Sequence, residues 1–174
     1  QARDRTGGLV FVEIEGTSSL RDRIGLTALE QILTDTGKLL VAELPEHAFA
    51  TRYGDGCYAV FCPEQDEADL EKLATRLRAA LVAHPFRAEG KPLRLRVSAG
   101  VCGFRHGFAD AGAMLTAAER AARDARAVEK GVVRYAPAPR DADMHFSVLL
   151  GLIRNALERD AFELLYQPIV AVQG

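Results

Sequence analysis

The sequence predicts an α/β protein, an α+β sandwich in which helices cover one central and mostly antiparallel sheet. Three observations lead to this prediction. Strand-like runs rich in Val, Ile and Phe alternate with segments whose apolar residues recur every three to four positions. Two of these runs are joined by Gly54, Asp55 and Gly56, which is typical of a β-hairpin. The chain has 174 residues, of which 48% are hydrophobic and 26% charged, so it can bury a core without disulfides or a structural metal.

The first half of the chain is predicted to form a strand, a helix and a hairpin. Residues 9–14 are apolar and follow two glycines, which indicates a buried strand. Residues 16–19 offer N-cap side chains to one long amphipathic helix over residues 20–40. Residues 48–62 contain the two arms of the hairpin and its turn.

The second half is predicted to continue with a helix, a strand, a helix and a strand. A helical pattern runs over residues 66–84. Residues 93–101 alternate between apolar and polar, which predicts a strand with unlike faces. A further helix follows Asp110, and residues 132–135 form a short strand. This order is close to the split βαβ plan.

The chain is predicted to divide into two parts at residues 137–140. A proline-rich stretch at residues 137–140 indicates a linker. The linker separates a first domain, residues 1–136, from a second part, residues 141–174. That second part starts with an amphipathic helix and ends in a strand-like run at residues 162–172.

Cysteine usage and charge exclude several classes of protein. Cys57, Cys62 and Cys102 are odd in number and form no C-x-x-C pair, which argues against a disulfide framework and favours a cytoplasmic location. The formal net charge is −2, whereas a surface that tracks nucleic acid is normally strongly basic. No apolar run reaches about 18 residues. We therefore expect neither nucleic-acid binding nor membrane insertion.

Four segments carry family resemblances. The run R-Y-G-D-G-C-Y-A-V-F at residues 52–61 is similar to the signature hairpin R-Y-G-G-D-E-F-A-V-L of GGDEF domains, the diguanylate cyclases that join two GTP molecules into cyclic di-GMP. V-S-A-G-V at residues 97–101 and F-V-E-I-E at residues 11–15 resemble two further strands of that family. F-E-L-L-Y-Q-P-I-V at residues 162–170 is similar to the opening strand of EAL domains, the phosphodiesterase or receptor partners of GGDEF domains. These resemblances imply a tandem GGDEF–EAL protein with a nucleotidyl-cyclase or ferredoxin-like sheet in residues 1–136 and a truncated EAL domain after the linker.

The resemblance also implies that the catalytic signature is degenerate. The five signature positions hold Gly54, Asp55, Gly56, Cys57 and Tyr58. The magnesium ligands of the family fall on Glu13, Gly56 and Cys57, so two of three carboxylates are missing. Asp55 is not expected to substitute, because alternate residues of a hairpin point to opposite faces. We expect no cofactor, with magnesium present only if GTP binds.

Each of these residues also has an ordinary structural explanation. Glu13 and Glu15 share one strand face and are explained as solvated carboxylates at the end of the sheet. Gly56 suits a turn that needs positive φ, and Cys57 suits a small buried hydrophobe.

The resemblance implies a nucleotide pocket that is only partly retained. Its vestigial positions are Glu30, Arg21, Gly16, Thr17, Ser18, Arg126 and Lys130. The guanine-reading positions, aligned by Gly25 within one helix, are Arg21, which cannot accept a hydrogen bond, and Glu30, which can. The R-x-x-D motif of the family's product site would fall on residues 45–48 and is absent.

The functional expectation follows from these losses. We expect a catalytically inactive GGDEF domain that serves as a regulatory or dimerisation module in cyclic di-GMP signalling. Its expected partners are a second copy in a homodimer, the adjacent EAL domain, and cyclic di-GMP through the EAL half. Among tandem GGDEF–EAL proteins, this sequence most resembles the type in which both domains are degenerate. That type controls type IV pili and twitching motility. Two alternatives remain, a GTP-binding sensor that modulates an EAL phosphodiesterase or receptor, and a weak diguanylate cyclase.

Overall fold

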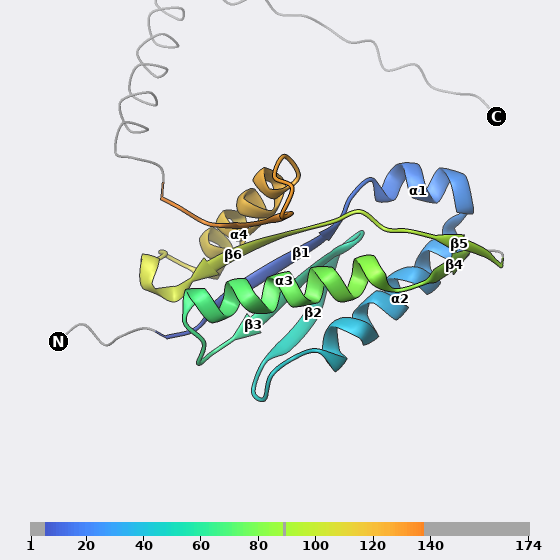
Figure 1. The fold of residues 1–174 in the computed structure, drawn as a ribbon. Coiled ribbons are helices and arrows are strands. Elements are labelled where there is room, and N and C mark those ends of the chain that lie inside the picture. The colour runs from blue at the N-terminus through green and yellow to red at the C-terminus, as the bar shows by residue number, and fades with distance from the viewer. Residues whose placement is uncertain (1–5, 89, 138–174) are drawn as a thin grey trace, which may run out of the picture. The chain divides into compact units, whose positions relative to one another are not determined.

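The structure is a computed structural model that describes residues 6–88 and 90–137 (Figure 1). Its elements are β1 (Gly8–Ile14), α1 (Thr17–Ile24), α2 (Leu26–Ala42), β2 (Phe49–Gly54), β3 (Cys57–Cys62), α3 (Glu67–Ala83), β4 (Phe86–Ala88), β5 (Lys91–Leu93), β6 (Val97–Gly103), the 3₁₀ turn η1 (Phe104–His106), α4 (Ala111–Ala125) and β7 (Val132–Arg134). Apart from Pro137, the predicted linker at residues 137–140 lies outside the described residues, as do the helix and strand predicted within residues 141–174. Among the described helices, none is both long and apolar enough to cross a bilayer.

Five strands form one sheet in the order β2-β3-β1-β6-β7. The central strand β1 pairs antiparallel with β3 on one side and with β6 on the other. β2 pairs antiparallel with β3, and β7 runs parallel to β6. The predicted fold, a mostly antiparallel sheet covered by helices, is therefore confirmed.

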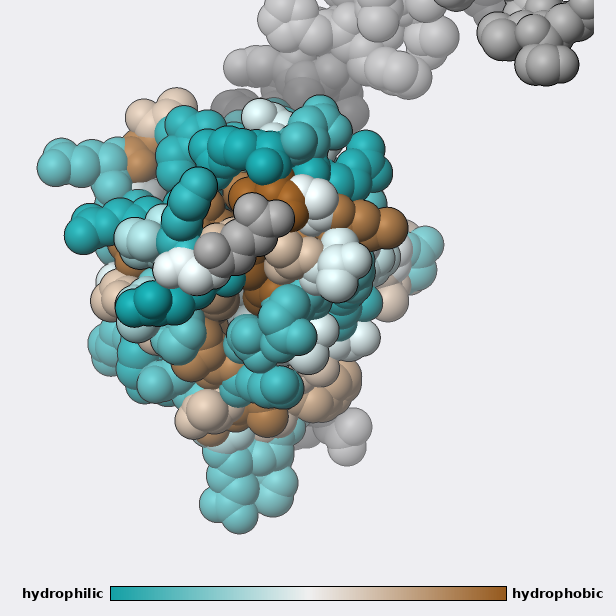
Figure 2. All heavy atoms as spheres, turned by 90° about the vertical axis from the view of Figure 1, so that its right-hand side faces the viewer, coloured by the Kyte–Doolittle hydropathy of each residue, from teal (hydrophilic) through white to brown (hydrophobic). Residues whose placement is uncertain are grey.

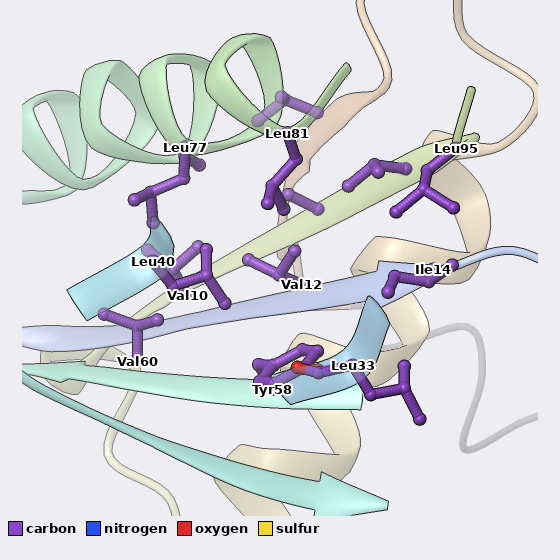
Figure 3. Packing of buried hydrophobic residues seen from close by; sticks show 14 of the residues in the cluster. Val10, Val12, Ile14, Leu33, Leu40, Tyr58, Val60, Leu77, Leu81 and Leu95 are labelled. Carbon is purple, nitrogen blue, oxygen red and sulfur yellow. The ribbon is translucent and has the colours of Figure 1, made fainter. Parts of the chain in front are cut away.

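Alternate residues of β1 face two separate cores, because successive side chains of a strand point to opposite faces. Val10, Val12 and Ile14 belong to the core under α2 and α3, part of which is seen in Figure 3. Leu9 and Phe11 belong to the second core, under α4. The sheet is thus the middle layer of a sandwich.

The single long helix predicted for residues 20–40 is wrong. The structure has two helices there, α1 and α2, which meet at Gly25. Gly25 has φ 79° and ψ 162°, a conformation that no helix contains and that glycine adopts readily. The N-cap predicted at residues 16–19 also differs, since α1 follows Gly16 in the left-handed region and no side chain caps it.

The strand predicted at residues 93–101 differs in its limits and its exposure. β5 pairs with β4 in a separate small hairpin, and β6 starts at Val97. All residues of β6 are buried, because α3 packs on one face and α4 on the other. A Cβ on Gly100 would lie 2.0 Å from the Ala118 carbonyl oxygen and 2.4 Å from the Ala122 nitrogen. The apparent polar face of this strand is therefore a face of small residues beneath α4.

Candidate functional site

The end of β1 lies beside the tip of the β2–β3 hairpin, and the first residue of α1 contacts that tip. Glu13 is the cross-strand partner of Cys57. The last residue of β1 donates its N–H to the Gly56 carbonyl at 2.8 Å. The Thr17 hydroxyl donates to the Asp55 carbonyl at 3.2 Å. The structure therefore brings together the first-strand glutamate, the signature hairpin and Thr17, one of the vestigial pocket positions that the sequence analysis singled out.

Gly56 has no room for a side chain. Its φ is 81°, and a Cβ would lie 2.3 Å from the Thr17 methyl carbon and 3.3 Å from the Ile14 Cβ. The turn explanation of this glycine is sufficient, and the Thr17 methyl fills the space next to the third signature position. Gly16, with φ 69°, is the N-cap residue of α1, and Ser18 is exposed in the first turn of that helix.

The Glu13 carboxylate forms an ion pair with the guanidinium of Arg126. Arg126, the C-cap residue of α4, donates to Glu13 Oε1, and the Glu13 side chain is only 18% exposed. Glu15 faces Arg96 with 3.7 Å between the carboxylate oxygen and Nε. The explanation of the two glutamates as merely solvated carboxylates is therefore wrong.

Cys57 carries a protonated thiol at neutral pH. Burial raises its pKa to about 11, and the nearby Glu13 and Glu119 carboxylates act in the same direction. Because the thiolate is the form that reacts and binds metals, this cysteine behaves as a half-buried apolar residue.

The residues at this point do not fit a centre for two magnesium ions. Magnesium requires several hard oxygen ligands in octahedral geometry. Here Gly56 supplies no ligand, Cys57 supplies a neutral sulfur, and the Glu13 carboxylate is already neutralised by Arg126. Within residues 6–88 and 90–137, no group of three or more His, Cys, Asp or Glu side chains is arranged to hold a metal ion.

Glu30 is paired with the arginine that opens the hairpin signature. Arg52 donates from Nη1 and Nη2 to the two Glu30 oxygens at 2.8 and 3.0 Å, and these hydrogen bonds hold the pKa of Glu30 below its ordinary value. Arg52 also donates from Nε to the Gly54 carbonyl at 3.3 Å and lies 3.7 Å from the exposed Asp55 carboxylate. Both carboxylate oxygens of Glu30, the one guanine-reading residue that can accept a hydrogen bond, are thus already paired with Arg52. The sequence analysis missed this pair, although an arginine and a glutamate at these two positions were a visible signal.

Two other vestigial positions lie apart from this cluster. Lys130 donates to Glu71 on α3, and Arg134 Nε lies 2.9 Å from the other oxygen of the same carboxylate. Arg21 is exposed on α1, whereas Glu30 is on α2 beyond the break at Gly25. Their alignment along one continuous helix is therefore wrong.

Tyr58, at the fifth signature position, has a structural role. Its side chain is 2% exposed, and its hydroxyl donates to the Leu33 carbonyl of α2 at 2.6 Å (Figure 3). Burial raises the pKa of Tyr58 to about 12. This hydrogen bond fixes the start of β3 to the helix that carries Glu30.

A helix-covered sheet whose central strand ends beside the hairpin of residues 52–61 is the arrangement that the resemblance to diguanylate cyclase domains implies. Consistent with this class, the family described as "Diguanylate cyclase, GGDEF domain" matches residues 1–131. The chain belongs to the GGDEF family.

Two relatives in sequence and one solved structure are similar to this chain. An uncharacterised protein of Thiocystis violacea is 31% identical over 99% of this chain and 26% of its own length. The diguanylate cyclase DgcP of Pseudomonas aeruginosa is 31% identical over 70% of this chain and 20% of its own length. The chain thus spans about a quarter or less of these relatives. The FimX GGDEF domain of Pseudomonas aeruginosa has the same fold, with a TM-score of 0.67, 24% identity, and coverage of 75% of this chain and 81% of that one.

Proposed function

We propose that this GGDEF domain is catalytically inactive and acts as a regulatory or dimerisation module in a cyclic di-GMP receptor protein. The observation that carries the proposal is the ion pair between Arg126 and Glu13. The carboxylate that remains at the metal position is neutralised by a cation of the chain itself.

The chemistry of the reaction supports the proposal. A 3′-hydroxyl must attack the α-phosphate of a second GTP, and divalent cations neutralise the charge that develops. The three positions that would hold these cations carry a paired glutamate, a glycine and a protonated thiol. The pair between Arg52 and Glu30 adds a second obstacle, because GTP would have to displace a bidentate guanidinium to reach the Glu30 oxygens.

The wider setting of the domain is part of the proposal. The similarity of residues 162–170 to an EAL opening strand supports a following EAL domain that binds cyclic di-GMP. The resemblance of the hairpin sequence to tandem proteins that control type IV pili is the basis for proposing a role in type IV pili and twitching motility. A homodimer through this domain would give the regulatory module its symmetry.

A calorimetric titration of the 174-residue chain tests the proposal. GTP and then cyclic di-GMP are added with magnesium and with manganese, and each mixture is separated by chromatography to detect product. The Arg52→Ala variant, which frees Glu30, is titrated in parallel.

The outcomes separate the candidate functions. Absence of GTP binding and of product in the wild type supports an inactive module. GTP binding without product would replace this proposal by the sensor, and formation of cyclic di-GMP would overturn it in favour of a cyclase. GTP binding that appears only in Arg52→Ala would support the proposal and identify the Arg52–Glu30 pair as the obstacle.

A further inference from the structure

The end of the domain formed by α1 and the β4–β5 hairpin carries a hollow of about 540 Å³. Three cationic side chains line it, Arg23 from the last turn of α1 and Lys91 and Arg94 from β5 and the residue after it. Figure 2 faces this end and shows hydrophilic residues gathered around a few hydrophobic ones. The hollow lies on elements that contribute nothing to the Glu13–Arg126 contact.

These three cations differ from most others in the fold. Arg52, Arg105, Arg126 and Arg134 each contact a carboxylate. In contrast, Arg23, Lys91 and Arg94 are exposed and form no ion pair with any other described residue. The three cations around one hollow create a locally positive potential, although the whole chain has a net charge of −2.

The surface between the cations is apolar. Ile24, Pro92 and Leu93 contribute to the lining of the hollow, and Ile24 and Leu93 are only partly buried by their own fold. Leu26, two residues after Ile24, is 60% exposed. An apolar centre with a charged rim is the anatomy of a protein–protein interface, in which arginine is enriched.

We propose that this hollow, the α1–β5 hollow, docks an acidic segment of a partner protein that presents an apolar side chain between carboxylates. The carboxylates pair with Arg23, Lys91 and Arg94, and the apolar side chain covers Ile24 and Leu93. A concave surface favours a side chain over a flat bilayer, which would touch the rim alone. Three cations around one hollow also do not form the row that a nucleic-acid backbone would follow.

A binding experiment on the full 174-residue chain tests this inference. The probe is a short fluorescent peptide with leucines flanked by glutamate pairs, and its matched control has glutamine in place of every glutamate. We expect saturable binding of the acidic peptide, weakened by added salt, and at least about tenfold weaker binding of the glutamine peptide. The Arg23→Gln, Lys91→Gln and Arg94→Gln triple variant should lose binding of the acidic peptide by a similar factor.

One variant controls for the site. Arg120→Gln removes an exposed cation of α4 and should leave binding unchanged. Circular dichroism confirms that each variant is folded. The inference is overturned if the folded wild type does not bind, if Arg120→Gln weakens binding as much as the triple variant, or if anionic vesicles or tripolyphosphate bind this hollow more tightly than the peptide. None of these outcomes depends on whether the cyclase site is active.

Discussion

Gly56 and Thr17 share a space that holds only one side chain. The sequence indicated a glycine turn at this position, and the observed φ of 81° agrees with it. The contact with Thr17 could not be predicted, because it depends on how the start of α1 approaches a hairpin tip nearly forty positions away. The same limit applies to the Arg126–Glu13 pair, whose partners are brought together only by the packing of α4 on β1.

Restoring a carboxylate at the third signature position should destabilise the domain. We expect Gly56→Asp to lower the free energy of unfolding by about 2 to 3 kcal/mol, because the left-handed φ and the Thr17 methyl both oppose a side chain. Gly54→Ala is the matched control, since its Cβ would meet nothing within 4 Å and its φ is not positive. Urea denaturation measures both changes. An equal loss for the two variants would contradict the steric argument.

The ion pair at the end of β1 should be measurable as a coupling between two substitutions. We expect Glu13→Gln and Arg126→Gln to show a coupling energy of about 0.5 to 1 kcal/mol in a double-mutant cycle, the range of partly exposed ion pairs. The unfolding free energies of the wild type, the two single variants and the double variant give this value, and strictly additive effects would show that the contact does not stabilise the fold.

At the scale of elements, the sequence predicted the strands and helices whose apolar residues recur at one regular spacing. It did not predict where such an element is broken or which of its faces is covered. The break between α1 and α2 is set by Gly25. The apolar residues of 20–40 keep one helical spacing before and after this glycine, so the pattern does not indicate a break. The sequence did not indicate that both faces of β6 are buried, because the small residues of one face resemble the polar residues of a solvent-exposed face. The burial of β6 is determined by the helices α3 and α4 that pack on it, and a pattern within one segment does not record such contacts.

Two glycine substitutions, one in β6 beneath α4 and one inside α2, are expected to have opposite effects on stability. Gly100→Ala should cost about 3 kcal/mol or more, because its Cβ would meet the backbone of α4, which cannot move aside independently. Gly37→Ala, in the interior of α2 with only an ordinary 3.7 Å contact to Tyr58, should instead stabilise by about 0.5 to 1 kcal/mol. Thermal unfolding of the two variants checks the signs, and a stable Gly100→Ala protein would contradict the close packing of α4 on β6.

At the scale of the whole molecule, one partly buried carboxylate joins elements distant in sequence. Glu67 at the start of α3 is 10% exposed and accepts hydrogen bonds from Arg105 and His106 of η1, the latter at 2.6 Å. His106 packs against Tyr135, the residue after β7, with ring centroids 5.2 Å apart. The sequence predicted the elements that meet here but gave no sign of η1, so this junction could not have been predicted.

This junction should make stability depend on pH in the acidic range. Burial alone would raise the pKa of Glu67, but the hydrogen bonds from Arg105 and His106 hold it below its ordinary value of 4.5. A carboxyl with a lowered folded-state pKa stabilises fully above pH 4.5 and loses that contribution as pH falls through the folded-state pKa. The stability advantage of the wild type over Glu67→Gln is therefore expected to be largest near neutral pH and to shrink below pH 4.5.

Thermal unfolding of the two proteins from about pH 3 to pH 7 measures this difference. Glu64→Gln, an exposed glutamate just before α3, controls for the change in net charge. A constant difference between wild type and Glu67→Gln across this range would show that the junction does not titrate.

The central position of β1 has a consequence for how the chain reaches its native state. Among the five strands of the sheet this one is synthesised first, but its neighbour on one side, β6, pairs Gly103 with Gly8 and emerges only after α3 and the β4–β5 hairpin. Until then an apolar strand of Val, Phe and Ile has one edge without a partner, and pairings distant in sequence form slowly. The nascent chain is therefore exposed to intermolecular strand pairing through β1 during synthesis, and chaperone capture of β1 would shield that edge until β6 closes the sheet.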